Sequence, residues 1–348
     1  MSRLTYFAKR IGLMIPVVIF GTSLTYLILY AGPINPAVAI VGPSADAAQI
    51  RQIEQQLGLN QPLWAQYFDF LGRMLTFDFG QSWVINPNTS IVDVIAHRVP
   101  RTIWLGFWAI LLPLFIGIPL GFHAGLHPNS WSDYLVSLGG IVWRAAPNFW
   151  LAVILLLGLS NSEQYLFGFN WKTFLVDTPQ LIGAPPLGFL SDPLGAITNP
   201  GEWWTQFLAA FKRILPAAFV LGSASLGNEL RIGRTAMLET KNSNYVEMAR
   251  AKGVSDRLLV WKHMFRNALI PLVPVITAEA GLLIGGSIIV EEVFSISGIG
   301  QLSFQAIIQG DVPLAAALTF IFVLLYVVIN ITQDFLYTVI DPRVSFEE

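Results

Sequence analysis

Apolar runs without a charged residue alternate along this chain with polar segments. Residues 11–31, 102–122 and 313–330 contain no Asp, Glu, Lys or Arg. A helix of about 20 apolar residues crosses the hydrocarbon of a bilayer, and a continuous apolar run favours a helix over a barrel strand, whose residues would alternate. The pattern predicts an all-α polytopic membrane protein with six transmembrane helices, at about 11–31, 102–124, 134–158, 209–230, 268–290 and 313–334.

The fourth span has a short charge-free run, residues 214–228. Lys212 and Arg213 precede this run, and Arg231 follows it. Long basic side chains at the ends of a span can extend to the lipid headgroups while their alkyl parts stay in the apolar layer. We therefore expect these three residues to mark the two membrane interfaces of the span.

The distribution of Lys and Arg orients the six spans. Basic residues in short loops collect on the cytoplasmic side of a membrane. Eight of them lie between Arg231 and Arg266, three precede the first span, and the connection 291–311 has none. Both termini are therefore predicted to be cytoplasmic.

This topology divides the chain into three parts. Residues 1–31 hold the cytoplasmic N-terminus and the first span, and residues 32–101 form an extracytoplasmic segment. Residues 102–348 form the transmembrane core, with an extracytoplasmic insert at 160–204 and a cytoplasmic segment at 239–267.

Composition agrees with a membrane protein and excludes several other classes. Hydrophobic residues make up 54% of the chain and charged residues only 12%, whereas soluble domains average about 25% charged residues. A net charge of −2 gives no bulk attraction to nucleic acid, and the absence of cysteine excludes disulfides and thiol chemistry. The first apolar run is longer than that of a signal peptide, and Gly32-Pro33 is a poor cleavage site, so we interpret it as a retained helix.

The basic segment between the fourth and fifth spans contains the signals of two helices. Asn244, with Glu247 three residues later, resembles a capping box. Gly253 ends this first helix, because glycine adopts a left-handed terminal conformation without steric cost. Ser255 caps a second helix, predicted over 256–268, that leads into the fifth span.

One face of the first helix combines small or apolar residues with a lysine, and by helical spacing these are Tyr245, Met248, Ala249 and Lys252. Such a face can seat in a groove of a partner protein. A solvated basic loop that follows the positive-inside distribution explains the same residues. The pattern alone leaves both interpretations open.

Two charged residues lie inside predicted spans. Glu279 is near the middle of the fifth span, where an ionisable group is costly and indicates a function by default. It either contacts a translocated solute or a second protein, or it is a protonated or hydrogen-bonded structural residue, and both interpretations stay open. Arg144 in the third span is interpreted as structural, extending to an interface or pairing with an acidic residue.

Motifs for catalysis and nucleotide binding are absent from the sequence. It contains no G-x-x-x-x-G-K-[ST], so the chain does not bind ATP through a P-loop of its own. It also contains no H-E-x-x-H and no G-x-S-x-G. His123 and His127 stand at the end of a span beside Pro128, and we interpret them as interfacial polar residues rather than as a metal pair. We expect no catalytic residue, metal or cofactor in this chain.

The cytoplasmic segment resembles a known motif. Residues 245–253, YVEMARAKG, followed by His263 and by residues 266–271, RNALIP, are similar to the coupling-helix motif of ABC importer permeases. The version is that of the binding-protein-dependent dipeptide, oligopeptide and nickel transport family. The likeness covers nearly the whole chain, with further matching residues at Leu57-Gly58-Leu59, Asp78-Phe79-Gly80, Gly117-Ile118-Pro119-Leu120-Gly121, Arg231, Arg234, Gly281, Gly286, Glu291 and Asp341-Pro342-Arg343.

The resemblance implies a type I ABC importer permease fold in the cell (cytoplasmic or inner) membrane. It implies that the first cytoplasmic helix docks into an ATPase subunit, and that residues 255–290, bent at Pro271 and Pro274, act as a lever that changes access in the membrane. The ATPase-coupling residues are then Tyr245, Val246, Glu247, Ala249, Arg250, Ala251, Lys252 and Gly253. Glu279 is the candidate for the translocation pathway.

The resemblance also implies partners. These are a second homologous permease subunit, one or two ABC ATPase subunits that bind ATP and Mg, an extracytoplasmic substrate-binding protein and the lipid bilayer. Peptides are the commonest cargo of the family, while nickel, opines and glycosides use similar permeases. The sequence does not select among these solutes.

Two other classes of protein explain the sequence less well. A self-contained secondary transporter would use Glu279 and Arg144 for ion coupling, but inverted repeats, which such transporters have, are not found in the sequence. The secondary-transporter hypothesis also leaves the helix at 245–253 without a role. A membrane-embedded hydrolase lacks a nucleophile or metal constellation.

Overall fold

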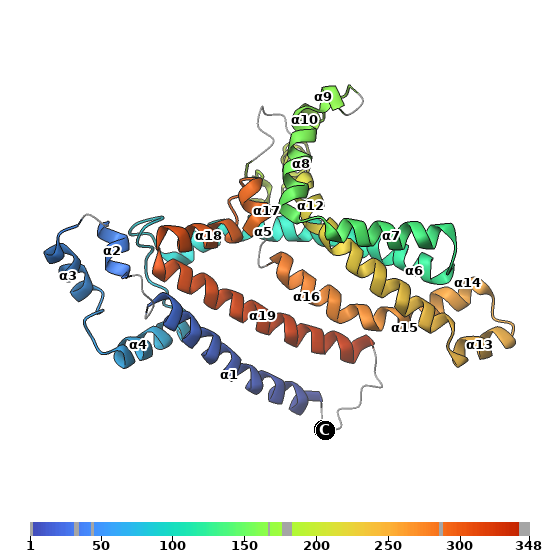
Figure 1. The fold of residues 1–348 in the computed structure, drawn as a ribbon, viewed down its shortest axis with the longest axis horizontal. Helices are drawn as coiled ribbons and strands as arrows, with labels where there is room; N and C mark the ends of the chain where they lie inside the picture. The colour runs from blue at the N-terminus through green and yellow to red at the C-terminus, as the bar shows by residue number, and fades with distance from the viewer. Residues whose placement is uncertain are drawn as a thin grey trace. The chain divides into compact units, whose positions relative to one another are not determined.

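The structure is a computed structural model that describes residues 3–30, 35–42, 45–165, 168–175, 183–284 and 288–340. Within these residues the regular structure is helical, apart from an isolated bridge between Gln81 and Ser90. The chain divides into two compact units, whose helices are labelled in Figure 1. The described residues of unit 1 lie within 3–100 and 298–331, and those of unit 2 lie within 101–297 and 332–340.

Unit 1 is built from segments near both ends of the chain. Its buried side chains form one core, in which the ring of Tyr26 lies 5.5 Å from that of Phe70. This contact folds part of the predicted outer segment onto the first helix. The helices of the unit are α1 (Arg3–Leu29), α2 (Pro36–Val41), α3 (Ala47–Gln56), α4 (Leu63–Leu75), the start of α5 (Ile91–Leu112), α18 (Ile299–Gln309) and most of α19 (Val312–Ile340).

A buried carboxylate joins two distant parts of unit 1. Asp311, fully buried just before α19, accepts a hydrogen bond from Ser82 Oγ at 2.5 Å. It also accepts the backbone N–H groups of Trp83, Val84 and Ile85, at 3.2, 3.0 and 3.0 Å. A buried acceptor with several donors is well satisfied. The loop that follows α4 is thereby held at the start of α19.

Unit 2 is organised along one long helix, α12 (Pro200–Lys241), which packs on α6, α7 and α8. Other elements of the unit are the end of α5, η1 (Pro113–Gly117), α6 (Ile118–Leu126), α7 (Trp131–Ala145), α8 (Asn148–Ser160), α9 (Ser162–Tyr165), α10 (Trp171–Leu175), η2 (Gly188–Ser191), α11 (Gly195–Thr198), α13 (Asn244–Ala251), α14 (Asp256–Leu258), η3 (Leu259–Met264), α15 (Phe265–Leu269), η4 (Ile270–Leu272), α16 (Val273–Ile284) and α17 (Ile288–Val293).

Glycines spaced four apart let η1 and α6 approach α12 closely. A Cβ added to Gly121 would lie 2.6 Å from the backbone oxygen of Leu230, and one added to Gly125 would lie 2.6 Å from that of Arg234. Gly117, one turn earlier, faces the same helix. Small residues at this spacing are how membrane helices bring their backbones together. The motif Gly117 to Gly121 of the sequence therefore has a packing role.

Four helical stretches among the described residues are long and apolar enough to cross a membrane, namely Lys9–Leu29, Ile91–Leu126, Pro200–Lys241 and Val312–Leu336. They contain most of the first, second, fourth and sixth predicted spans. A fifth stretch is the helix pair α7 and α8, bent by 96°. The count of six spans and the cytoplasmic termini remain predictions.

The third predicted span is broken in its middle. Residues 134–158 were expected as one helix, but α7 ends at Ala145 and α8 begins at Asn148. Ala146, with ψ of 122°, has extended backbone, as a residue before a proline usually does, and Pro147 has no N–H to continue the helix. The break is therefore encoded locally by Pro147.

Several expectations fall on residues outside those described. They concern Gly32-Pro33, Gly286, and the tail Asp341-Pro342-Arg343. The fifth predicted span, 268–290, is described as helical on both sides of residues 285–287.

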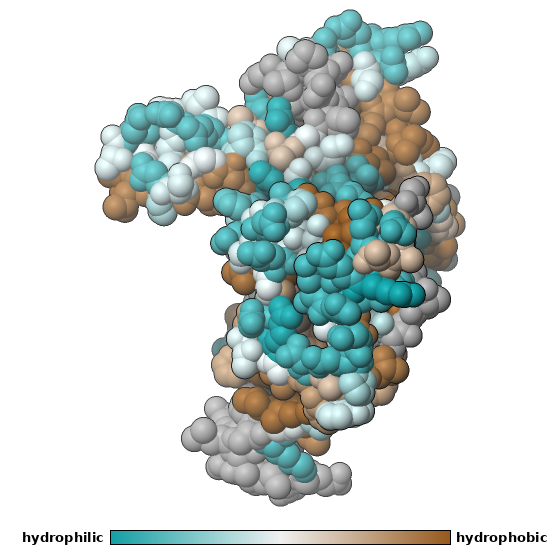
Figure 2. Space-filling model, turned by 90° about the vertical axis from the view of Figure 1, so that its left-hand side faces the viewer, coloured by the Kyte–Doolittle hydropathy of each residue, from teal (hydrophilic) through white to brown (hydrophobic). Residues whose placement is uncertain are grey.

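Large apolar side chains are exposed on several helices. Phe20 of α1 is 70% exposed, and Leu135 and Ile141 of α7 are 70% and 66% exposed. Figure 2 shows broad brown apolar surface next to teal polar surface on the face it draws. Exposed apolar surface of this extent indicates contact with lipid or with another protein.

Candidate functional site

The motif at residues 245–253 folds into the short helix α13, as predicted, but its first turn differs in one detail. Ser243, rather than Asn244, is the N-cap residue, with extended backbone at φ −81° and ψ 145°. Its hydroxyl donates to the carbonyl oxygen of Thr240 at 2.6 Å and does not cap α13. The hydroxyl thus binds the end of α12, and the predicted capping box does not form.

The end of α13 is the one predicted from Gly253. This glycine is left-handed, with φ of +77°. Its N–H donates to the oxygen of Arg250 at 3.0 Å, and the N–H of Val254 donates to the oxygen of Ala249 at 3.2 Å. This pair of bonds is a Schellman motif, which satisfies the last carbonyls of a helix. A well-capped end makes α13 a stiff element in spite of its 8 residues.

Tyr245 ties α13 to the helical segment that follows it. Its hydroxyl accepts a hydrogen bond from Asn267 Nδ2 at 2.9 Å and donates to the backbone oxygen of His263 at 3.4 Å. Asn267 Nδ2 also donates to the oxygen of His263, at 2.9 Å. All three residues belong to the motif recognised in the sequence. Their contact explains why the two halves of the motif, 245–253 and 263–271, occur together.

The predicted coupling residues divide between two sides of α13. Val246 is fully buried, and Ala249 is partly buried against the same core. Tyr245 is 42% exposed, and Met248, which was not in the predicted set, is 60% exposed. The remaining residues of the predicted set are exposed: Glu247, Arg250, Ala251, Lys252 and Gly253. Ala249 thus belongs more to the attachment of the helix than to its exposed side.

A core of apolar side chains holds α13 in unit 2. It is contributed by α6, α12, α13 and the segment from η3 to η4, and comprises Ile118, Phe122, Ala236, Met237, Val246, Leu259, Met264, Ala268 and Leu272. Full burial of one such side chain stabilises the fold by about 1.5–3 kcal/mol. The exposed side of α13 is therefore presented on a packed base.

The segment after α13 is nearly continuous helix from Asp256 to Ile284, as predicted for the lever. Its geometry changes twice. Around Pro271 the helix tightens to a 3-10 turn, η4, where a bend was expected because proline lacks an N–H. A π-helical turn, η3, was not predicted, and π turns often occur at functional sites.

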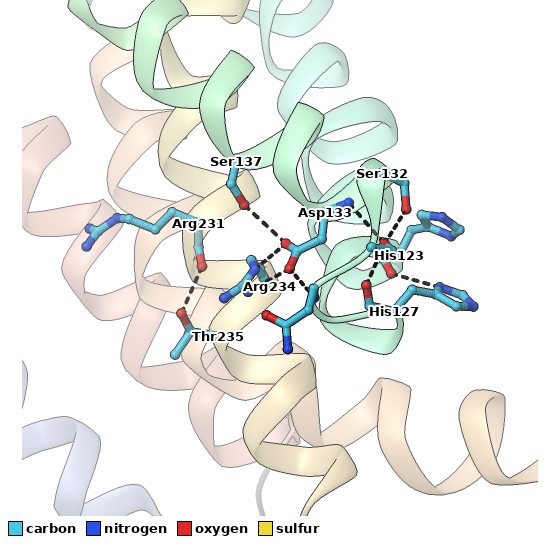
Figure 3. A network of polar contacts seen from close by, with 10 residues as sticks. His123, His127, Ser132, Asp133, Ser137, Arg231, Arg234 and Thr235 are labelled. Carbon is cyan, nitrogen blue, oxygen red and sulfur yellow. Dashed lines mark hydrogen bonds and ion pairs between the residues drawn. The ribbon is translucent and has the colours of Figure 1, made fainter.

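An ion pair fixes α12 to α7 near the same end of α12. Arg234 Nε and Nη2 donate to the two carboxylate oxygens of Asp133, at 2.5 and 2.8 Å. Asp133 also accepts the Ser137 hydroxyl at 3.2 Å and the Asn129 N–H at 2.9 Å. Figure 3 shows the Asp133 and Arg234 side chains pointing toward each other, with Arg231 directed away. A bidentate arginine–carboxylate pair is a strong and geometrically specific contact.

A second contact fixes the last turn of α12. Lys241 Nζ donates to the backbone oxygen of Leu126, at the end of α6, at 2.6 Å. Together with the ion pair, this bond holds the helix that leads into α13. The sequence indicated Arg231 and Arg234 through the resemblance, but nothing singled out Asp133 or Lys241. Asp133 could have been noticed as an acid three residues after Ser130, which caps α7.

A groove of about 780 Å³ runs between α7 and α12. Asp133, Arg144, Arg231 and Arg234 lie along it. Arg144 Nη1 donates to Asn228 Oδ1 at 3.4 Å. The structural interpretation of Arg144 is compatible with this contact between α7 and α12.

Glu279 lies on α16 and is partly exposed. Sequence reasoning missed a second acidic residue of this unit. Glu229 of α12 is fully buried. Glu229 comes directly after the charge-free run 214–228, and this position was the available signal.

His123 and His127 have their rings 4.5 Å apart, and His127 Nδ1 is 3.1 Å from the oxygen of His123. Within the described residues, no group of three or more His, Cys, Asp or Glu side chains is arranged to hold a metal ion.

Comparison with known proteins identifies relatives over the full length. The family described as "Binding-protein-dependent transport system inner membrane component" matches residues 117–346, and its N-terminal companion matches residues 3–106. The oligopeptide transport system permease protein AppB of Bacillus subtilis is 32% identical, with 98% of this chain and 99% of that protein covered. The dipeptide transport system permease protein DppB of Alkalihalophilus pseudofirmus is 32% identical, with 99% and 100% covered.

The glutathione transport system permease protein GsiC of Salmonella typhimurium is also 32% identical, with 99% of this chain and 100% of that protein covered. Among solved structures, a chain of the MetNI methionine ABC transporter matches with a TM-score of 0.48 and 19% identity, over 72% of this chain and 97% of that one. The family model matches residues 117–346, and AppB is 32% identical along nearly the whole length. The chain therefore belongs to the family of binding-protein-dependent transport system inner membrane components.

Proposed function

We propose that this chain is the permease subunit of an ATP-driven importer and forms part of the path by which a small solute crosses the membrane. Family membership supports this proposal, and so do the long apolar helices of α1, α5, α12 and α19. The full topology that we propose is six spans with both termini cytoplasmic, in the type I ABC importer permease fold.

The observation that carries the coupling role is the attachment of α13. Val246 anchors this helix in the core, and the hydroxyl of Tyr245 joins it to Asn267. Movement of α13 is therefore transmitted to the helical segment that runs from Asp256 to Ile284. We propose that an ATPase subunit seats on the exposed side of α13, where Met248 is the most exposed apolar residue.

We propose the predicted coupling residues for this role, with Val246 and Ala249 holding the helix from its buried side, and we add Met248, which was not in the predicted set. Met248 and the ring of Tyr245 supply apolar contact. Arg250 and Lys252 are exposed, and exposed ion pairs contribute only about 0–1 kcal/mol each. Seating of apolar surface therefore matters more than charge for affinity.

The proposed partners follow from the same role. They are a second homologous permease subunit, one or two ATPase subunits that bind ATP and Mg, and an extracytoplasmic substrate-binding protein. The chain itself would carry out no catalysis. Peptides or similar small solutes are the proposed cargo, because relatives are named for oligopeptide, dipeptide and glutathione transport.

Recovery of the ATPase with variant permeases tests the docking role. Met248→Glu places a charge on the exposed side of α13 without touching its buried side, and it should sharply reduce the ATPase recovered with the permease. Gly253→Pro should do the same, because proline cannot adopt the left-handed backbone of this residue. Ala249→Arg should also abolish transport, although it disturbs the core as well.

The matched control is Ile308→Gln, which changes an equally exposed apolar residue on α18, outside the cytoplasmic segment. It should leave ATPase recovery unchanged. An undiminished, transport-competent complex from Met248→Glu would contradict the docking role. Uptake into vesicles by this chain alone under an ion gradient, without ATPase subunits, would contradict the importer itself and favour a secondary transporter.

A further inference from the structure

The groove between α7 and α12 has a volume of about 780 Å³ and lies within unit 2. Its walls come from both helices, and none of the described residues that line it belongs to α13. Gly140 and Gly227 line it where the two helices touch, since a Cβ added to Gly227 would lie 2.4 Å from the backbone oxygen of Gly140. Because neither glycine has a side chain, the space beside this contact stays open. Pockets of roughly 300–1,000 Å³ are the size that takes small ligands.

Polar contacts mark the two ends of the groove. Asp133 pairs with Arg234 at one end, and Arg144 donates to Asn228 at the other. The rise from Asp133 to Arg144 along α7 is about 16 Å. The groove is therefore long enough for a ligand that has more than one chemical part.

The lining between these two ends includes apolar side chains. Ile141 of α7 and Leu230 of α12 contribute to it, and Ile141 is 66% exposed. Leu138, one turn before Ile141, and Val142 continue this apolar surface on α7, at 61% and 67% exposed. A helix of the third predicted span thus presents a hydrocarbon-compatible surface beside the groove.

The charges along the groove do not cancel. Three arginines and one aspartate line it. Asp133 neutralises Arg234, and Arg231 is turned away from that pair (Figure 3). Among the described residues, no carboxylate forms an ion pair with Arg144 or Arg231, and the buried Glu229 bonds to neither. Both guanidinium groups belong to exposed residues. Two positive charges therefore remain beside apolar surface.

These two arginines lie within reach of one anion. Arg144 is bonded to Asn228, and Asn228 and Arg231 are neighbours on α12, because residues three apart on a helix have Cβ atoms about 5–6 Å apart. A guanidinium group binds phosphate through two parallel N–H groups. Arg231 directly follows the fourth predicted span, so we expect this part of the groove at the level of the lipid headgroups.

We propose that the groove between α7 and α12 binds one anionic phospholipid. Its phosphate lies between Arg144 and Arg231, and its acyl chains cover Ile141 and the exposed apolar surface of α7. A free phosphate would leave that apolar surface uncovered, and a neutral lipid would leave the two positive charges without a counterion. Basic pockets between membrane helices bind anionic headgroups in this way. The site does not depend on the proposed transport function.

Native mass spectrometry of the full chain tests the site, with equal amounts of phosphatidylglycerol and phosphatidylcholine of the same acyl chains in the detergent. The wild type should retain one phosphatidylglycerol at least about tenfold more often than phosphatidylcholine, because each arginine near an anionic headgroup contributes a factor of about five. Arg144→Gln/Arg231→Gln should remove this preference.

The matched control is Arg51→Gln/Arg257→Gln, which removes the same charge from two exposed arginines outside the groove. It should keep the preference of the wild type. Equal preferences in the groove variant and in this control would overturn the proposal, because general surface charge would then hold the lipid.

Thermal unfolding of the wild type gives a second measurement, which does not depend on any variant folding. A ligand that binds only the folded protein stabilises it. Phosphatidylglycerol should therefore raise the unfolding midpoint more than phosphatidylcholine or inorganic phosphate at the same concentration. An equal rise with phosphatidylcholine would overturn the role of the arginines, and an equal rise with inorganic phosphate would reduce the site to an anion site without a lipid.

The assembled complex tests whether a protein covers the groove instead. Phosphatidylglycerol should stay bound when the permease is purified together with its partner subunits. Its loss on assembly would overturn the proposal, because a protein partner would then occupy the groove. Absence of ATP-driven uptake by a complex that retains the lipid would count against the proposed function alone.

Discussion

The hydroxyl of Tyr245 accepts a hydrogen bond from the side-chain amide of Asn267, 22 residues further along the chain, at 2.9 Å. Both residues are exposed to solvent. Tyr245 comes from the first half of the motif and Asn267 from the second. The bond joins α13 to the helical segment that follows it.

Loss of this bond should weaken coupling without unfolding the protein. Tyr245→Phe keeps the ring and removes the hydroxyl, and Asn267→Ala removes the donor. A hydrogen bond of this kind contributes about 0.5–1.5 kcal/mol. Each variant should slow ATP-driven uptake, and the double variant should be no slower than the more severe single one.

Tyr326→Phe is the matched control, since it removes the hydroxyl of an exposed tyrosine on α19. Its uptake should equal that of the wild type. Fully additive effects of Tyr245→Phe and Asn267→Ala would show that the bond does not link the two residues functionally.

A methyl group at Gly121 should destabilise the packing of α6 on α12. Its Cβ would meet the backbone oxygen of Leu230, which cannot rotate away. Overpacking of this kind costs about 1–3 kcal/mol. Gly121→Ala should therefore lower the midpoint of thermal unfolding in detergent.

Gly139→Ala, on α7, is the corresponding control because nothing lies within 4 Å of its added Cβ. Replacing a helical glycine by alanine in open space stabilises by up to about 1 kcal/mol. Equal midpoints for the two variants would mean that the close approach of α6 and α12 is not required.

The Asp133–Arg234 pair should show strong non-additivity. Asp133 is 3% exposed and Arg234 30% exposed, so removing one partner leaves the other partly buried and unpaired. Breaking such a pair costs about 3 kcal/mol, at the lower end for buried pairs because Arg234 is in part solvated. Asp133→Ala should be clearly less stable than Asp133→Ala/Arg234→Met, measured by thermal unfolding. A double variant less stable than either single one would refute this.

Removal of the Asp311 carboxylate should release the loop at residues 82–85. Asp311→Ala leaves three partly buried backbone N–H groups without their acceptor, and each N–H that water cannot reach costs about 1–3 kcal/mol. Limited proteolysis should then cut near this loop. Ser82→Ala removes one donor to Asp311 and the acceptor of the Asn86 N–H but keeps the three backbone bonds, so it should be cut more slowly. Equal rates of cutting for the two variants would argue against the role of Asp311.

Local patterns predicted much of the fold. Hydropathy located the apolar helices of α1, α5, α12 and α19, and Gly253 located the end of α13, because each signal depends on a few consecutive residues. One exception was also local, because Pro147 breaks the third predicted span. The other was not, because no residue in the sequence marks the π turn η3.

The candidate site was predicted as a set of residues, with one face of the helix assigned by helical spacing. The resemblance identified residues 245–253 as a unit, but the structure separates Val246, which is buried, from Met248, which is exposed. Helical spacing placed Ala249 on the docking face, whereas it packs toward the core. Which side of a short helix faces the protein depends on what packs against it, and periodicity over 8 residues does not specify that.

The sequence by itself determined that this is a multi-pass helical membrane protein of a known transport family, and it predicted a segment for docking to a partner. Hydropathy, basic residues and a contiguous motif suffice for that, because they are properties of neighbouring residues. Only the tertiary structure decided that Glu229 is buried, that Asp133 holds Arg234 across 101 residues, and that Asp311 holds Ser82 across 229. Such pairs depend on how each helix is rotated and how closely glycines let it approach its neighbour, and no single segment of the chain encodes those quantities.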